Sequence, residues 1–169
     1  MRDSCYLMRE DSEKEISGED FICLLHAVLE KGVSLKFKAK GFSMTPFIKG
    51  GDVITLAPFG RADYLSLGSV VAFIKPETKH LVVHRIVGRT DNGFIIKGDN
   101  VKEPHDIVPG TNVLGLVKKV ERNGRQAYAA LGPEKRVQAF LSRNTNLLPT
   151  MVTAWRQIRN LLGIKTKYE

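Results

Sequence analysis

Apolar and polar positions follow three different patterns along this chain of 169 residues. In residues 17–32 apolar side chains recur at helical spacing, which predicts an amphipathic helix. The residues that share its apolar face are Phe21, Leu24, Leu25 and Val28. Ser17 or Asp20 can cap this helix, and Gly32 ends it. Residues 1–16 are mostly polar, and we expect them to be mobile.

Residues 33–131 contain short apolar runs separated by turn residues, the pattern of an all-β unit of about six or seven strands. The runs expected to form strands are residues 33–39, 52–58, 68–74, 80–87, 93–98, 112–121 and 125–131. Asn123 and Gly124 separate the last two runs, and an Asn-Gly pair at that place predicts a tight hairpin.

Helical spacing returns after Pro133, and we expect helices over residues 133–144 and 150–165. The second helix has an apolar stripe made of Val152, Trp155, Ile158, Leu161 and Leu162. Its opposite face is basic and carries Arg156, Arg159 and Lys165. A helix of this kind can lie in a membrane interface or pack its stripe against the parent domain, and both interpretations stay open.

The expected fold is therefore mainly β, with an N-terminal helix and a C-terminal helical segment. We expect a mobile N-terminus and helix in residues 1–32, a β-rich domain in residues 33–131 and a basic helical segment in residues 132–169. The net charge is +8 overall and differs between regions: it is −5 over residues 1–30 and +8 over residues 118–169. The basic end is either a solvated surface or a site for an acidic partner such as anionic lipid, nucleic acid or another protein.

The sequence contains no strong signal for a metal, a cofactor or a membrane-spanning segment. Cys5 and Cys23 have no metal-ligand spacing, so we expect free thiols in a reducing compartment. No glycine-rich phosphate loop is present, and no apolar run reaches the roughly 18 residues that span a bilayer. The acidic N-terminus does not resemble a secretory signal, so we expect a cytoplasmic or peripheral membrane protein.

Ser43 is the first candidate for chemistry, because it lies among apolar residues at a break between two predicted strands. It is either a buried structural serine or a nucleophile. A serine hydroxyl becomes a nucleophile when a base takes its proton and a third group orients that base. His84 is the candidate base: on a strand it shares a face with Val82 and Ile86, where a neutral imidazole can accept a proton. A core histidine bonded to a backbone carbonyl is the alternative.

Two aspartates follow His84 at places where a carboxylate can hold its second ring nitrogen. Asp99 comes after a glycine at the end of an apolar run, and Asp106 lies in the next segment. Ordinary turn chemistry also explains a Gly-Asp-Asn sequence, so each aspartate alone is weak evidence. The order of serine, histidine and aspartate is more informative than any one of them.

Five short boxes occur in the same order as in type I signal peptidases, and over residues 35–121 the chain resembles that family. They are SMTP at residues 43–46, GD at 51–52, GSVVAF at 68–73, HRIV at 84–87 and KGDN at 97–100. The similarity is to the branch, found in archaea and the endoplasmic reticulum, in which a histidine replaces the lysine base. It implies the β-rich peptidase fold shared with LexA-type repressors and a serine endopeptidase activity on a leader or precursor peptide.

Carried over from the resemblance, Ser43 is the nucleophile, His84 is the general base, and Asp106 or Asp99 orients the histidine. The strand at residues 33–39 is then expected to pair with an extended substrate. Walls of the substrate groove are expected from Phe42, Met44 and Phe47. The expected partners are a peptide substrate and an anionic membrane surface bound by the C-terminal helix; we expect no nucleic acid and no cofactor.

The sequence departs from the family at three places. Gly41 stands where relatives often carry a hydroxyl that helps to hold the oxyanion, a second asparagine is missing after KGDN, and the segment before Ser43 is a short amphipathic helix instead of a membrane anchor. Two alternatives therefore remain. One is a non-catalytic module that binds peptide or membrane, and the other is a LexA-like self-cleaving regulator. The regulator needs a lysine where His84 stands, whereas Lys79 and Lys97 only flank that strand.

Overall fold

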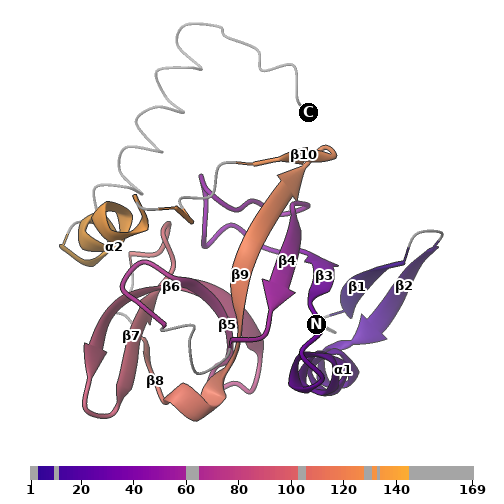
Figure 1. Cartoon of the computed structure of the whole chain (residues 1–169), viewed down its shortest axis with the longest axis horizontal. Helices are drawn as coiled ribbons and strands as arrows, with labels where there is room; N and C mark the ends of the chain where they lie inside the picture. Colours follow the sequence, from indigo (N-terminus) through magenta and orange to yellow (C-terminus); the bar gives the residue numbers. More distant parts are fainter. Residues whose placement is uncertain are drawn as a thin grey trace, which may run out of the picture.

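The structure is a computed structural model that describes residues 4–9, 12–59, 65–102, 106–127, 131–132 and 134–144 (Figure 1). Side chains are described from residue 18 onward. The helix predicted over residues 150–165, with its Trp155 stripe, lies outside the described residues, as does Cys5 as a side chain.

The described chain is mainly β, as the alternation of apolar runs predicts. Its helices are α1 (Gly18–Glu30), α2 (Lys135–Asn144) and a short 3-10 helix (Gly110–Asn112). Its strands are β1 (Ser4–Arg9), β2 (Ser12–Ser17), β3 (Leu35–Lys38), β4 (Val53–Ala57), β5 (Val70–Ile74), β6 (Leu81–Thr90), β7 (Gly93–Lys97), β8 (Asp106–Val108), β9 (Val113–Arg122) and β10 (Arg125–Gln126). The strand expected over residues 125–131 is thus described only as the two residues of β10.

These strands form one antiparallel sheet in the order β2-β1-β3-β4-β9-β5-β6-β7-β8, with β10 paired to β9. In Figure 1 the strands β5 to β8 curve around one end of the sheet, and the β1–β2 hairpin lies at the other end. Bulges interrupt the register between Thr55 and Leu56, between Ala72 and Phe73, and between Ile86 and Gly88. Bulges increase twist and bend the strand that contains them, which agrees with this curvature.

The N-terminal segment differs from its prediction. Instead of a mobile polar tail, the structure has β1 and β2 paired from Ser4↔Ser17 to Arg9↔Ser12, and β1 also pairs with β3 at Leu7↔Phe37. The charged residues of this segment hide any strand signal in the sequence. The hairpin can still form at a sheet edge, because it is held by main-chain hydrogen bonds.

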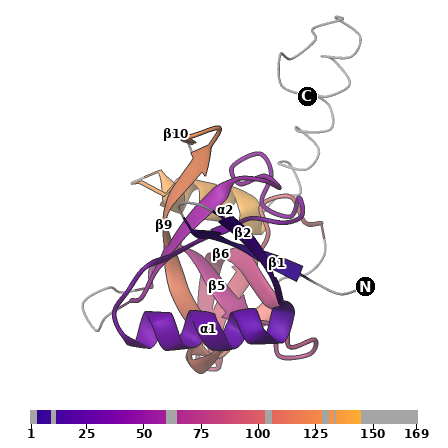
Figure 2. The same ribbon diagram turned by 90° about the vertical axis from the view of Figure 1, so that its right-hand side faces the viewer.

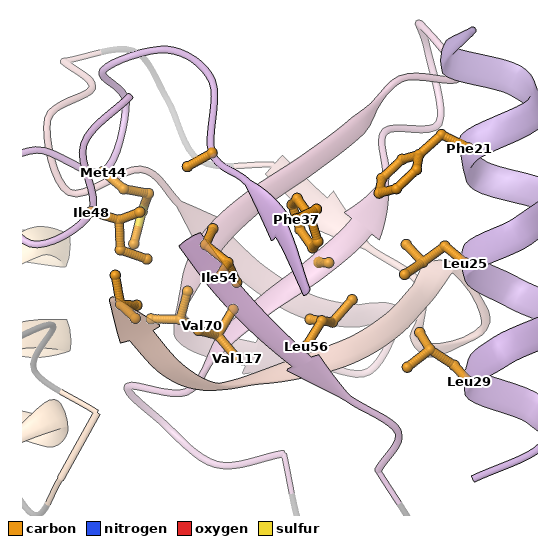
Figure 3. Close-up of a cluster of buried hydrophobic side chains, with 13 residues drawn as sticks. Phe21, Leu25, Leu29, Phe37, Met44, Ile48, Ile54, Leu56, Val70 and Val117 are labelled. Carbon is orange, nitrogen blue, oxygen red and sulfur yellow. The ribbon is translucent and has the colours of Figure 1, made fainter. Parts of the chain in front are cut away.

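One large apolar cluster lies between α1 and the sheet, and Figure 3 shows it in close-up. α1 lies beside β3 and β9 and contributes Phe21, Leu25 and Leu29, all of them buried (Figure 2). The rings of Phe21 and Phe37 meet edge to face, with centroids 5.4 Å apart. Each fully buried aromatic or aliphatic side chain of this kind stabilises a fold by about 1.5–3 kcal/mol, so the cluster fixes where β3 ends and the Ser43 loop begins.

A second apolar cluster lies on the other face of β5 and β6. Its buried members are Val71, Phe73, Ile86, Ile96, Val108 and Val113. β5 is buried on both faces, since Val70 and Ala72 belong to the first cluster and Val71 and Phe73 to the second. This explains why residues 70–74 are an unbroken apolar run, as is usual for a strand buried on both sides. The candidate base, His84, lies on β6 on the face of the second cluster.

Helix α2 presents an unusual surface. Its buried side chains are Gln138, Ala139 and Ser142, two of them polar, whereas Val137 and Phe140 are each 63% exposed. The helix therefore packs against the domain through small and polar residues, and its large apolar residues are exposed. Among the described helices, none has both the length and the apolar character needed to cross a membrane.

Candidate active site

Ser43 lies in the loop between β3 and β4, half-buried, within a series of tight turns. Gly41 has a φ of +79°, a conformation that glycine adopts without strain, and it turns the chain away from β3. The amide of Thr45 then donates to the carbonyl of Phe42 at 3.1 Å, and that of Ile48 donates to Met44 at 3.0 Å. The side chains of Met44 and Ile48 are buried, so the loop is fixed to the core directly after Ser43.

Asp52 closes this loop at its far end. Its buried carboxylate accepts a hydrogen bond from the amide of Lys49 at 2.8 Å and two at 2.7 Å from the guanidinium of Arg122. Arg122 lies on β9, which pairs with β4, and also donates to the carbonyl of Phe47. The GD box at residues 51–52 therefore holds the Ser43 loop in place.

His84 lies on β6 opposite Val71 of β5, and its ring is tilted against that of Phe73, with centroids 6.1 Å apart. The prediction that it shares a face with Val82 and Ile86 is confirmed, since both pack in the second cluster. Its Nδ1 atom is buried and has no hydrogen-bond partner among the described residues.

Burial keeps His84 neutral. It is the main cause that lowers the pKa of this imidazole from 6.5 to about 4, because a buried charge loses its hydration. The carboxylates of Asp106 and, to a smaller extent, Asp99 raise the pKa, and the ammonium of Lys75 lowers it. At neutral pH the ring is thus free to accept a proton.

Gly98, in the turn after β7, brings the serine and the histidine together. A Cβ atom at Gly98 would lie 2.8 Å from the carbonyl oxygen of Ser43 and 3.0 Å from Nε2 of His84. The carbonyl oxygen of Ser43 and Nε2 of His84 thus approach the same point in space, beside Gly98. No direct hydrogen bond between the Ser43 hydroxyl and His84 is present in this structure, and such contacts often tighten only when substrate binds.

Asp99 serves a different partner from the one predicted. Its buried carboxylate accepts hydrogen bonds from Nε and NH2 of Arg85, the closest at 2.8 Å, and another from the hydroxyl of Ser142 at 2.9 Å. Arg85 also donates to the carbonyl of Gly68 and lies 5.6 Å from the centroid of the Phe47 ring. Asp99 therefore neutralises a buried arginine and makes no hydrogen bond to His84.

Asp106, at the start of β8, is half-buried and pairs in register with Ile96 of β7. Its carboxylate forms an ion pair with Lys75, with Oδ1 and Nζ 2.9 Å apart. It makes no hydrogen bond to Nδ1 of His84, although it is the carboxylate that raises the pKa of His84 most. Of the two aspartates, Asp106 is the one whose charge acts more strongly on the ring.

The three predicted wall residues have different surroundings. Phe42 is 73% exposed and is available to a ligand, and Phe47 is half-buried over Arg85. Met44 is only 4% exposed and belongs to the core cluster, so in this structure it forms no open wall. Of the apolar residues around Ser43, some therefore belong to the core and others lie at the surface.

The edge of β3 that was expected to pair with substrate is not open along its whole length. One side of β3 pairs with β4 from Leu35↔Leu56 to Lys38↔Val53, and the other side meets β1 at Leu7↔Phe37. An extended peptide on that side must lie beyond this contact or displace β1.

Sequence reasoning missed Arg85 although a signal was present. A lone arginine inside the apolar run at residues 80–87 must be neutralised when the strand is buried, and Asp99, which follows the next predicted strand, is an acid that could do so. No cluster of three His, Cys, Asp or Glu side chains among the described residues is placed to hold a metal ion.

Comparisons with protein-family models, with curated proteins and with solved structures found no match to this chain. What the site can do chemically therefore rests on its own geometry: a half-buried serine on a braced loop, a neutral histidine whose Nε2 lies next to the same glycine as the serine carbonyl, and a carboxylate that acts on the ring through its charge.

Proposed function

We propose that this protein is a serine endopeptidase of the signal peptidase type, with the β-fold of that family, in which Ser43 attacks the scissile carbonyl and His84 is the general base. The observation that carries the proposal is the convergence at Gly98, where the Ser43 carbonyl oxygen and Nε2 of His84 both lie within 3.0 Å of one point. Ser43 and His84 are therefore neighbours across Gly98, and the proposal requires that rotation of the Ser43 side chain bring Oγ within hydrogen-bond reach of Nε2.

In the proposed reaction, Nε2 of His84 takes the proton of the Ser43 hydroxyl as Oγ forms a bond to the carbonyl carbon of the peptide. The same nitrogen then returns the proton to the leaving amine, and water hydrolyses the acyl-enzyme in a second cycle. The lowered pKa of His84 keeps the ring unprotonated at neutral pH, and it also makes the ring a weaker base, so the charge of Asp106 is needed to stabilise the imidazolium.

Asp106 is the better candidate to stabilise the imidazolium that forms during the reaction. Asp99 is engaged by Arg85 and Ser142, whereas the charge of Asp106 has the larger effect on the pKa of His84. The unpartnered Nδ1 of His84 leaves a donor site that a carboxylate can take up when the ring becomes charged.

The substrate is proposed to be a leader or precursor peptide bound in extended form near β3 and the exposed Phe42. Cleavage is tested by incubating the full chain with a library of unstructured peptides and detecting products by mass spectrometry, with Ser43→Ala in parallel. Products formed by the wild type and missing with Ser43→Ala support the proposal; equal products from both, or none from the wild type, contradict it.

Two alternatives are separated by the same assay. A non-catalytic peptide- or membrane-binding module on this fold yields no products. A LexA-like self-cleaving regulator needs a lysine base, but Lys79 lies exposed in the β5–β6 turn and Lys97 pairs in register with Arg85, not with His84. A loss of activity in Lys79→Ala or Lys97→Ala comparable to that in Ser43→Ala would favour the regulator.

We also propose that the peptidase acts at an anionic membrane surface. The notable feature among the described residues is the outward apolar face of α2, with Val137 and Phe140, on a helix whose charged residues are all basic. Apolar side chains beside basic ones are typical of helices that lie in a membrane interface. The basic amphipathic helix that the sequence predicts at residues 150–165 lies outside the described residues.

A further inference from the structure

Asn100 holds two successive carbonyl groups of the nucleophile loop. Its backbone amide donates to the carbonyl oxygen of Ser43 at 2.7 Å, and its side-chain Nδ2 donates to the carbonyl oxygen of Phe42 at 3.3 Å. The Phe42 carbonyl also accepts from the amide of Thr45 at 3.1 Å. Both peptide groups that flank Ser43 are therefore held from outside the loop, across 58 residues of sequence.

The hydrogen bond from Asn100 to the Phe42 carbonyl fixes the direction of the Ser43 N–H. The carbonyl of Phe42 and the amide of Ser43 belong to one planar peptide group, and in a trans peptide the two point in opposite directions. The cis peptide bond of this loop is Thr45–Pro46, so the bond between Phe42 and Ser43 is trans. With the Phe42 oxygen held towards Asn100, the Ser43 N–H points away from it.

This N–H is free to serve a ligand. Within the part of the chain that the structure describes, the Ser43 amide donates no hydrogen bond. The amide of a serine nucleophile is a common donor to the oxyanion of the tetrahedral intermediate. Gly41 contributes no hydroxyl nearby, so the direction of this one N–H matters more here.

We propose that Asn100 is a positioning residue that aims the Ser43 N–H at the developing oxyanion. The inference rests on the proposed peptidase function and adds a residue that touches neither the substrate nor the reacting atoms. It also gives the turn after β7 three separate tasks: Gly98 leaves space for His84 and Ser43, Asp99 neutralises Arg85, and Asn100 orients the nucleophile's peptide group.

Two substitutions separate the donor from the shape of the side chain. Asn100→Asp keeps the shape but replaces the donor by an acceptor, which repels the Phe42 oxygen. Asn100→Ala removes both. Either variant keeps the backbone amide that holds the Ser43 carbonyl, so we expect the loop to stay folded. Asn112 is the matched control, because its Nδ2 donates to the carbonyl of Ile74 at 3.2 Å, away from Ser43.

The measurement is the rate at which a fluorophosphonate probe labels Ser43 in the full chain. In labelling, Oγ of Ser43 forms a bond to phosphorus, the P–F bond breaks, fluoride leaves, and the proton passes to His84; the negative phosphonyl oxygen lies where the oxyanion would. We expect a rate about 10- to 100-fold lower in Asn100→Ala. Asn100→Asp should be at least as slow, with the thermal midpoint of both within a few degrees of the wild type, and Asn112→Ala should label at the wild-type rate.

The outcomes are distinct. If the wild type is labelled and Asn100→Ala is labelled at the same rate, or if Asn100→Asp behaves as the wild type, the positioning role is wrong while the proposed function stands. The role is equally wrong if Asn112→Ala slows labelling as much. If the wild type is not labelled at Ser43 at all, the proposed function fails and this inference fails with it.

Discussion

The guanidinium of Arg85 and the carboxylate of Asp99 form a completely buried ion pair, with NH2 of Arg85 2.8 Å from Oδ2 of Asp99. Arg85 follows His84 on β6, so its side chain leaves the strand on the opposite face. The pair therefore ties the turn after β7 to β6 on one side while His84 faces the other. This arrangement fixes the position of Gly98, between His84 and the Ser43 loop.

Removal of one partner of this pair should mainly lower the free energy of unfolding, and any loss of activity should follow from that loss of stability. In Asp99→Asn the charge of Arg85 stays buried without compensation, which costs about 3–5 kcal/mol in comparable cases. We expect a loss of this size in urea-induced unfolding. Asp91→Asn, at the exposed β6–β7 turn, is the control and should change little. If Asp99→Asn is as stable as the wild type but inactive, the result would instead indicate that Asp99 orients His84.

Gly98→Ala should reduce activity more than stability. The new methyl group would lie 2.6 Å from Cγ2 of Val101, 2.8 Å from the Ser43 oxygen and 3.0 Å from Nε2 of His84, all closer than normal contacts. Relief of these contacts displaces the base from the nucleophile, and displacements of about 1 Å can cost 100-fold in rate. The peptide-cleavage rate and the thermal midpoint are compared with those of Gly110→Ala, where the added methyl group meets only the Phe94 ring at 3.7 Å, an ordinary contact. Equal activity of Gly98→Ala and wild type would contradict the claim that the close approach of Ser43 and His84 at Gly98 forms an active site.

The pH dependence of kcat/KM should show a base that titrates below the usual range of histidine. Only the neutral ring accepts a proton, and burial lowers the pKa of His84 to about 4. Activity should therefore fall as the pH drops towards 4 and should be constant, as far as His84 is concerned, from about pH 5.5 to 8. His84→Ala should lose most of the activity throughout. A midpoint near 6.5, or undiminished activity in His84→Ala, would contradict the burial or the role of His84.

Binding to vesicles tests the proposed membrane surface. Phe140→Ser and Val137→Ser place polar groups on the outward face of α2, so they should weaken sedimentation with anionic vesicles at low salt and leave the thermal midpoint nearly unchanged. Neutral vesicles should bind little, because each basic residue near an anionic surface adds about 1 kcal/mol. If these residues are instead covered by another part of the protein, the variants lower the thermal midpoint and the wild type stays in the supernatant.

Local pattern predicted much of this structure. The alternation at residues 33–39 and the unbroken apolar run at 70–74 correspond to β3 and β5, because a period of two and burial on both faces leave direct marks in sequence. The face of His84 followed from the same periodicity. β8, which carries Asp106, was missed because a three-residue strand is too short to show a period.

The remaining details depend on residues that meet only after folding. That Asp99 binds Arg85 and not His84 is decided by which face of β6 the turn reaches, and Asn100 meets Phe42 through a backbone carbonyl that has no sequence signature. The Leu7↔Phe37 contact of β1 with β3 is likewise a main-chain pairing at a sheet edge. The sequence predicted the residue types of the site, whereas these contacts, which set its geometry, could not be predicted from it.

Site-specific labelling of Ser43 tests the central claim most directly. The full chain is treated with a fluorophosphonate, digested and analysed by mass spectrometry, together with Ser43→Ala, His84→Ala and Ser34→Ala, an exposed serine near the start of β3. We predict a single labelled peptide that contains Ser43, absent in Ser43→Ala, much reduced in His84→Ala and unchanged in Ser34→Ala. Labelling that persists in Ser43→Ala, or no labelling of Ser43 in the wild type, would contradict the assignment of Ser43 as a nucleophile activated by His84.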